Sequence, residues 1–332
     1  MTATYSDEHF WKNYMIHWFG EALIKQWEER VELTEIDTAK GKIKVEVYRN
    51  REPEKPVLVF AHGIAGYARI LLPFLMPLFE KGYHLVAPDL EGYGYNERLK
   101  GDFTWDTHLH DLKETVAYAR STFEGKLFLG GASMGGPLAY ATEARYHCAD
   151  GLICWCLWDL SDRAFIRKET TTKGLTYPLI PLLRVLAKLW GRLRLKTYYT
   201  ISYDTLTDSP AFNNLLKKDP QAGTFISLRG ILSLITQSKP DQGHQKYDKP
   251  ILVCQPEGDQ MIPSLYSEKM FQQIPSTRKS YCRFEGAHFP LDRSTYEKWA
   301  DCVDRFIQEQ GGLGDGRPKS EDGRRETFFT KG

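Results

Sequence analysis

The chain has 332 residues, of which 42% are hydrophobic and 26% charged, and its formal net charge is +1 at pH 7. A chain of this length can bury one large core, or a core with an inserted subdomain. With no excess of either charge, the sequence makes no case for a nucleic-acid partner. Its six cysteines are too few for a disulfide scaffold, so we expect buried free thiols.

The N-terminus and the apolar stretches bear on targeting and membrane insertion. Residues 1–8 lack the basic and apolar pattern of a signal peptide. The longest uncharged apolar stretches, residues 70–79 and 174–183, contain prolines and are too short to span a membrane. We therefore expect a soluble, cytoplasmic protein, and its oligomeric state stays open.

The N-terminal segment, residues 1–30, is predicted to contain one amphipathic helix. Aromatic residues recur at near-helical spacing between residues 8 and 30. This pattern is typical of a helix that packs one face on the main domain. Binding to a membrane or a partner is the alternative interpretation.

Strands and helices alternate after this segment. Two alternating runs, residues 31–36 and 43–48, predict a β-hairpin. The continuous apolar run at 57–61 is typical of a strand buried on both faces. Further strands are expected at 83–88, 126–130, 151–157, 250–254 and 279–284, and helices at 69–81, 105–122, 134–147, 264–273 and 290–310. This order predicts an α/β fold with a mostly parallel sheet flanked by helices.

Residues 160–245 interrupt the alternation. They carry helical patterns rather than strands, which predicts a helical cap inserted into a core formed by residues 31–159 and 246–310. Ligands of parallel sheets bind beyond the carboxyl ends of the strands, and we expect the cap to lie there. The tail, residues 311–332, is glycine-rich and polar and is predicted to be disordered.

A basic stripe is expected on the main cap helix. Residues 175–195 are apolar apart from four cations, of which Arg184, Lys188 and Arg192 recur at every fourth position and Arg194 follows. One interpretation is a solvated face of the cap. The other is a lid that makes peripheral contact with a membrane, where cations meet headgroups and leucines meet acyl chains.

The central motif is GASMG at residues 131–135. It stands between an expected strand and an expected helix, which is the context of a nucleophile elbow with Ser133 at the turn. The amide of Met134, at the start of the helix, is then placed to donate to a developing oxyanion. In the loop after strand 57–61, a glycine would turn the amide of Ile64 toward the serine as a second donor. We expect His62 to brace this loop rather than to act as a base.

Two further loops carry candidate partners for the serine. Asp259 follows strand 250–254, and His288 follows strand 279–284. Serine, acid and histidine in this chain order match the order of α/β-hydrolase triads. Because all three follow strands of one parallel sheet, we expect them to meet at one edge.

Other residues offer competing interpretations. Asp159 is the alternative acid, and Glu257 is a weaker one. His108, His110 and Asp111 are spaced like metal ligands, but they fall at the start of a helix that packs on the sheet, and triad chemistry needs no metal. We therefore expect neither a metal site nor a cofactor.

Together these motifs resemble those of the α/β-hydrolase superfamily over residues 57–160 and 248–308. The resemblance rests on HG at 62–63, PDLEGYG at 88–94, GASMGG at 131–136, GD at 258–259 and GAH at 286–288. The cap length and the last three motifs are similar to the monoacylglycerol-lipase and lysophospholipase-like branch. Many relatives have histidine in place of Ala132.

The resemblance implies a serine hydrolase that cleaves a carboxylic ester through a Ser133–His288–Asp259 triad and an acyl-serine intermediate. An apolar pocket would favour a small-molecule or lipid-like ester such as a monoacylglycerol or a lysophospholipid. The residues expected to line this pocket are Trp155, Trp158, Leu179 and Leu183. Hydrolysis of an amide, lactone, thioester or C–C bond on the same triad is the alternative, as is a non-catalytic ligand-binding protein.

Overall fold

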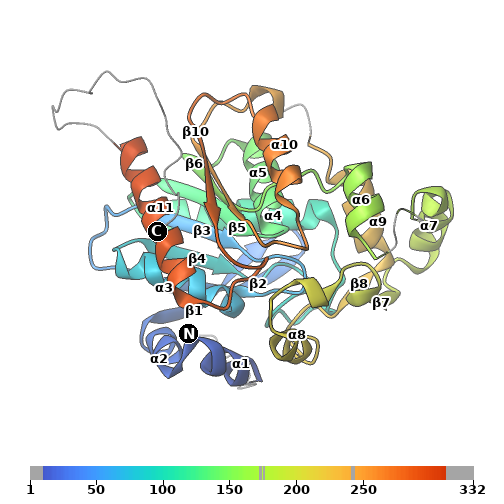
Figure 1. Ribbon diagram of the computed structural model, residues 1–332, viewed down its shortest axis with the longest axis horizontal. Coiled ribbons are helices and arrows are strands. Elements are labelled where there is room, and N and C mark those ends of the chain that lie inside the picture. Colours follow the sequence, from blue (N-terminus) through green and yellow to red (C-terminus); the bar gives the residue numbers. More distant parts are fainter. Residues whose placement is uncertain (1–9, 172–173, 175, 241–243, 312–332) are drawn as a thin grey trace.

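The computed structural model describes residues 10–171, 174, 176–240 and 244–311, and it contains a sheet of eight strands (Figure 1). The strand order is β1-β2-β4-β3-β5-β6-β9-β10. The two strands at the β1 edge pair antiparallel with their neighbours, and every other pair is parallel. The strands are β1 (Val31–Thr38), β2 (Gly41–Tyr48), β3 (Val57–Ala61), β4 (His84–Pro88), β5 (Leu127–Ala132), β6 (Gly151–Trp155), β9 (Ile251–Pro256) and β10 (Lys279–Phe284). The predicted mostly parallel sheet is confirmed.

Helices cover both faces of the sheet. The side chains of β3 alternate between two clusters, since Leu58 and Phe60 belong to one and Val57 and Val59 to the other. The first cluster includes α3 and α11, and the second includes α4 and α5. These helices are η1 with α3 (Ala68–Leu71 and Leu72–Glu80), α4 (Trp105–Thr122), α5 (Gly135–Tyr146), α10 (Ser264–Gln273) and α11 (Arg293–Gly311). The expected helices are therefore present, with ends shifted by a few residues.

The N-terminal segment differs from its prediction. Instead of one helix it forms α1 (Phe10–Phe19) and α2 (Glu21–Arg30), separated by Gly20 with a φ of 85°. Glycine adopts such a φ without steric strain, and this conformation turns the chain between the two helices. The turn brings Trp11 against Trp27, with ring centroids 5.1 Å apart. Residues 1–9 lie outside the described part of the chain.

The insertion, residues 160–245, is not wholly helical as predicted. It contains α6 (Arg163–Glu169), α7 (Thr176–Trp190), α8 (Pro210–Leu216), α9 (Leu228–Gln237) and a two-stranded sheet of β7 (Arg194–Lys196) and β8 (Phe225–Ser227). Strands of three residues are too short to show alternation in sequence. Figure 1 shows the insertion beside the sheet, with α8 near α1. Of the tail predicted to be disordered, residues 311–332, Gly311 is instead the last residue of α11, and residues 312–332 lie outside the described residues.

The expected basic stripe is also shorter than predicted. Helix α7 ends at Trp190, so Arg192 lies beyond it and instead pairs with Asp102 of the core, Nε to Oδ2 at 3.1 Å. Arg229 donates to both oxygens of the same carboxylate, from Nε to Oδ1 and from Nη2 to Oδ2, each at 2.6 Å. These contacts tie the insertion to the loop between β4 and α4. Within the described ranges, no helix combines the length and apolar character needed to cross a membrane.

Candidate active site

Ser133 lies in the turn between β5 and α5. Its φ is 56°, in the left-handed region, where a non-glycine residue is strained and needs fixed partners. Its amide donates to the carbonyl of Trp155 at 2.9 Å, and its carbonyl accepts from the amide of Gly136 at 2.9 Å. A Cβ at Gly135 would lie 2.3 Å from the carbonyl oxygen of Ala61, so strand and helix can meet this closely only with glycine there.

The loop after β3 runs directly beside Ser133. A Cβ built on Gly63 would lie 2.7 Å from the Cβ of Ser133 and 3.1 Å from its Oγ. Within the described part of the chain, the amides of Ile64 and Met134 donate no hydrogen bond. Two free amides flanking a serine are what an oxyanion hole requires.

His288 and Asp259 form a buried pair. Nδ1 of His288 lies 2.7 Å from Oδ2 of Asp259, and both side chains are almost fully buried. The other oxygen of Asp259 accepts from the amides of Met261 at 2.9 Å and Ile262 at 2.7 Å, which fixes the carboxylate. Nε2 of His288 is buried and has no hydrogen-bond partner among the described residues. A base oriented in this way can take a proton from a hydroxyl on its free side.

A cavity of about 480 Å³ joins these groups. Both Ser133 and His288 line it, together with Gly63, Ile64 and Met134. The four residues expected to line a pocket, Trp155, Trp158, Leu179 and Leu183, all lie in its wall. Most other wall residues are apolar side chains of the insertion, joined by Ile70 and Leu71 of η1 and Phe74 of α3. Such a cavity suits a hydrophobic ligand with one polar group near the serine.

The two alternative acids, Asp159 and Glu257, have partners other than His288. The carboxylate of Asp159 accepts from the amide and hydroxyl of Ser161. Glu257 is exposed, and its Oε1 lies 3.8 Å from Nη1 of Arg283. Asp259 is therefore the acid that reaches His288.

His62 braces its loop, as expected. Its Nδ1 lies 2.8 Å from the carbonyl oxygen of Gly63, and its Nε2 accepts from the amide of Leu90 at 3.1 Å. Burial lowers the pKa of His62 to about 4, so the ring stays neutral at pH 7. A neutral ring with both nitrogens occupied cannot serve as the base.

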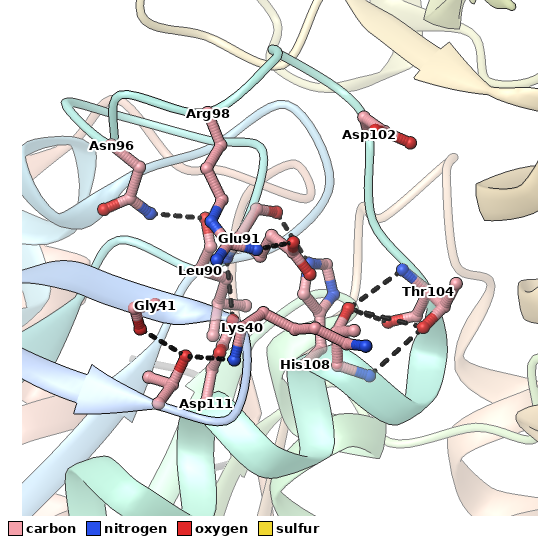
Figure 2. A network of polar contacts seen from close by, with 12 residues as sticks. Lys40, Gly41, Leu90, Glu91, Asn96, Arg98, Asp102, Thr104, His108 and Asp111 are labelled. Carbon is pink, nitrogen blue, oxygen red and sulfur yellow. Dashed lines mark hydrogen bonds and ion pairs between the residues drawn. The ribbon is translucent and has the colours of Figure 1, made fainter. Parts of the chain in front are cut away.

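His108 and Asp111 both form hydrogen bonds with the main chain of the loop after β4 (Figure 2). Nε2 of His108 lies 2.9 Å from the carbonyl oxygen of Glu91, and Asp111 accepts from the amide of Glu91 at 2.8 Å. Burial lowers the pKa of His108 to about 3 and raises that of Asp111 to about 7. His110 is partly exposed and lies 3.8 Å from Asp106. These contacts give each side chain a role in fixing the fold.

One neighbour of the candidate triad could not be predicted from the sequence. Sγ of Cys156 lies 3.4 Å from Oδ2 of Asp259 and 3.9 Å from Nδ1 of His288. The sequence pattern indicated a buried thiol and nothing more. Its position directly after β6, between β5 and β9, is the signal that would have placed it near the candidate triad, because the carboxyl ends of these parallel strands lie at one edge of the sheet.

The sheet order, the strained serine between strand and helix, and the histidine–aspartate pair define a hydrolase of the serine-dependent α/β-hydrolase type. The chain belongs to the family described as serine aminopeptidase, S33 (Hydrolase_4), whose model matches residues 52–289. The N-terminal helices lie outside this match.

Among curated relatives, the chain is 30% identical to Lipase 3 of Moraxella sp. over 120 residues, 35% of this chain and only 36% of that protein. It is 25% identical to phospholipase YtpA of Bacillus subtilis over 246 residues, 71% of this chain and 88% of that protein. A soluble variant of monoglyceride lipase from Saccharomyces cerevisiae has a similar fold, with a TM-score of 0.66 and 20% identity over 84% of this chain and 96% of that one. These two curated relatives are thus a lipase and a phospholipase.

Proposed function

We propose that the protein is a serine hydrolase that cleaves a carboxylic ester with a lipid-like acyl chain, such as a monoacylglycerol or a lysophospholipid. The observation that carries this proposal is the apolar cavity of about 480 Å³ with Ser133 and His288 in its wall. The names of the relatives, which include lipases and a phospholipase, support the same substrate class.

In the proposed mechanism, Nε2 of His288 takes the proton of Ser133 as its Oγ attacks the ester carbonyl. Asp259 holds the imidazole in the required tautomer and stabilises the imidazolium. The amides of Ile64 and Met134 bind the oxyanion of the tetrahedral intermediate. The imidazolium protonates the leaving alcohol, and water activated by the same histidine then hydrolyses the acyl-serine.

The alternative suggested by the family description is cleavage of an aminoacyl amide. An aminopeptidase must bind a substrate ammonium group, which calls for acidic side chains in the site. Among the described residues that line the cavity, Glu169 is the one acid, and its Oε1 already accepts from the hydroxyl of Tyr266 at 3.0 Å. The apolar wall therefore favours an ester with a hydrocarbon chain.

We further propose that the insertion acts as a cap that contacts a lipid surface. Leu179 and Leu183 of α7 reach the cavity wall. On the same helix Leu182, Val185 and Leu189 are 53%, 56% and 62% exposed. Apolar side chains exposed on a helix that also carries basic residues are typical of interfacial binding.

We also propose that the protein acts in the cytoplasm. All six cysteines are free. Unpaired cysteines are typical of proteins in reducing compartments.

The test is hydrolysis of p-nitrophenyl esters, from acetate to palmitate, by the wild type and by Ser133→Ala. We expect kcat/KM to rise with chain length and turnover to fall by about 10⁴-fold or more in the variant. Activity that falls steadily from acetate to decanoate would contradict the acyl pocket. Turnover of an aminoacyl p-nitroanilide above that of every ester would favour the aminopeptidase alternative.

A further inference from the structure

The two residues at the end of β6, Trp155 and Cys156, contact all three members of the proposed triad. The carbonyl of Trp155 accepts from the amide of Ser133 at 2.9 Å, and its indole Nε1 donates to the carbonyl of His288 at 2.9 Å. The thiol of Cys156 donates to Oδ2 of Asp259 at 3.4 Å. We propose that this dipeptide positions the triad, with each residue acting through the catalytic groups; the inference rests on the proposed function.

The backbone holds the dipeptide in a strained turn. Cys156 has a φ of 65°, which a residue with a side chain adopts only when its surroundings fix it. Its amide donates to the carbonyl of Cys254 on β9 at 2.8 Å. Its carbonyl oxygen lies 2.2 Å from where a Cβ on Gly136 would stand, so helix α5 packs directly on the turn. The turn is thus tied to β9 and to the helix that follows Ser133.

The indole of Trp155 cannot turn away from His288. The side chain is 1% exposed, and its ring packs against Phe74, Phe284 and Tyr296 at centroid distances of 5.2, 5.5 and 6.4 Å. Rings packed on several sides keep one orientation. The indole N–H therefore fixes the main chain of the loop that carries His288.

The thiol of Cys156 completes the set of donors around Asp259. Oδ1 of this acid accepts from two main-chain amides, whereas Oδ2 faces His288, the thiol and, at 3.5 Å, the side-chain Nε2 of Gln255. Burial and the charge of Asp259 raise the pKa of Cys156 well above its ordinary value, so the thiol keeps its proton and donates. Cys156 does not line the cavity, which separates its role from that of a nucleophile.

The experiment compares Cys156→Ala, Cys156→Ser and Trp155→Phe with the wild type in ester hydrolysis. Losing either hydrogen bond should lower kcat by about threefold to tenfold. In the two Cys156 variants KM should stay within about twofold, because Cys156 does not line the cavity, whereas Trp155 does. Serine at position 156 keeps a donor and should restore most of kcat. The rate at which a fluorophosphonate labels Ser133 gives a second readout that needs no substrate.

Matched controls separate positioning from packing. Cys254→Ala removes an equally buried thiol from the neighbouring strand, and Trp11→Phe removes a buried indole N–H that has no partner among the described residues. Both should keep the wild-type kcat. A folded Cys156→Ala enzyme with unchanged kcat and labelling rate, or a serine variant as impaired as the alanine one, would overturn the inference. Full ester turnover by Ser133→Ala would instead overturn the proposed function.

Discussion

The phenol oxygen of Tyr14 lies 2.6 Å from Oδ2 of Asp219, which joins helix α1 to the insertion. Tyr67, in the loop that carries the proposed oxyanion donor Ile64, donates to the same oxygen at 2.6 Å. Asp219 is almost fully buried. The N-terminal helix, the oxyanion loop and the insertion therefore meet at one carboxylate, although only the last two fall within the family match.

The variant Tyr14→Phe should destabilise the protein by about 1.5–3 kcal/mol, because a hydrogen bond to a buried charge is lost without a replacement. Urea unfolding measures this change. Tyr281→Phe is the control, since the buried hydroxyl of Tyr281 has no partner among the described residues, and its stability should change by less than about 0.5 kcal/mol. Equal stabilities for the two variants would show that the contact contributes nothing.

Gly63→Ala should leave the fold intact and remove most of the activity. The new methyl group would lie 2.7 Å from the Cβ of Ser133, so the oxyanion loop must shift away from the serine. Misplacing one oxyanion donor costs about 10²–10³ in kcat. The measurement is kcat together with the urea midpoint, and a variant with wild-type kcat would contradict the assignment of Ile64 as a donor.

Asp111→Asn should stabilise the protein increasingly as the pH rises. Burial raises the pKa of Asp111 from 3.8 to about 7, so the folded state keeps a proton that the unfolded state has lost. Wild-type stability therefore includes a contribution that is full below pH 3.8 and disappears as the pH approaches 7. The asparagine oxygen can still accept from the amide of Glu91 (Figure 2).

The measurement is the difference in unfolding free energy between Asp111→Asn and the wild type from pH 4 to pH 8. The difference should grow by up to about 1.4 kcal/mol per pH unit and level off above pH 7. The lowered pKa values of His62 and His108 make stability fall on acidification, but they act equally in both proteins and cancel. A difference that is constant with pH would contradict the raised pKa.

Much of the fold was predictable because short apolar runs such as residues 57–61, flanked by turn residues, favour strands buried on both faces. The break at Gly20 was not, since the aromatic spacing continues through it and only the φ of 85° reveals the turn. The three-residue strands β7 and β8 were missed because alternation needs a longer run.

The candidate site could be proposed where each residue follows its own strand, as Ser133, Asp259 and His288 do, because topology brings such loops together. The contact between Cys156 and Asp259 depends on how the chain after β9 folds back toward β6. The spacing of residues in the sequence does not predict how this loop folds. Positioning contacts of this kind emerge only from the packed structure.

The most direct test of the proposed triad is covalent labelling with a fluorophosphonate, followed by mass spectrometry of the intact protein and its peptides. We expect one label per chain, on Ser133, with no labelling of Ser133→Ala and labelling slowed by about 10³-fold or more in His288→Ala. A folded wild-type protein that takes up no label, or one labelled equally well in the absence of His288, would contradict the proposed triad and favour a non-catalytic ligand-binding protein.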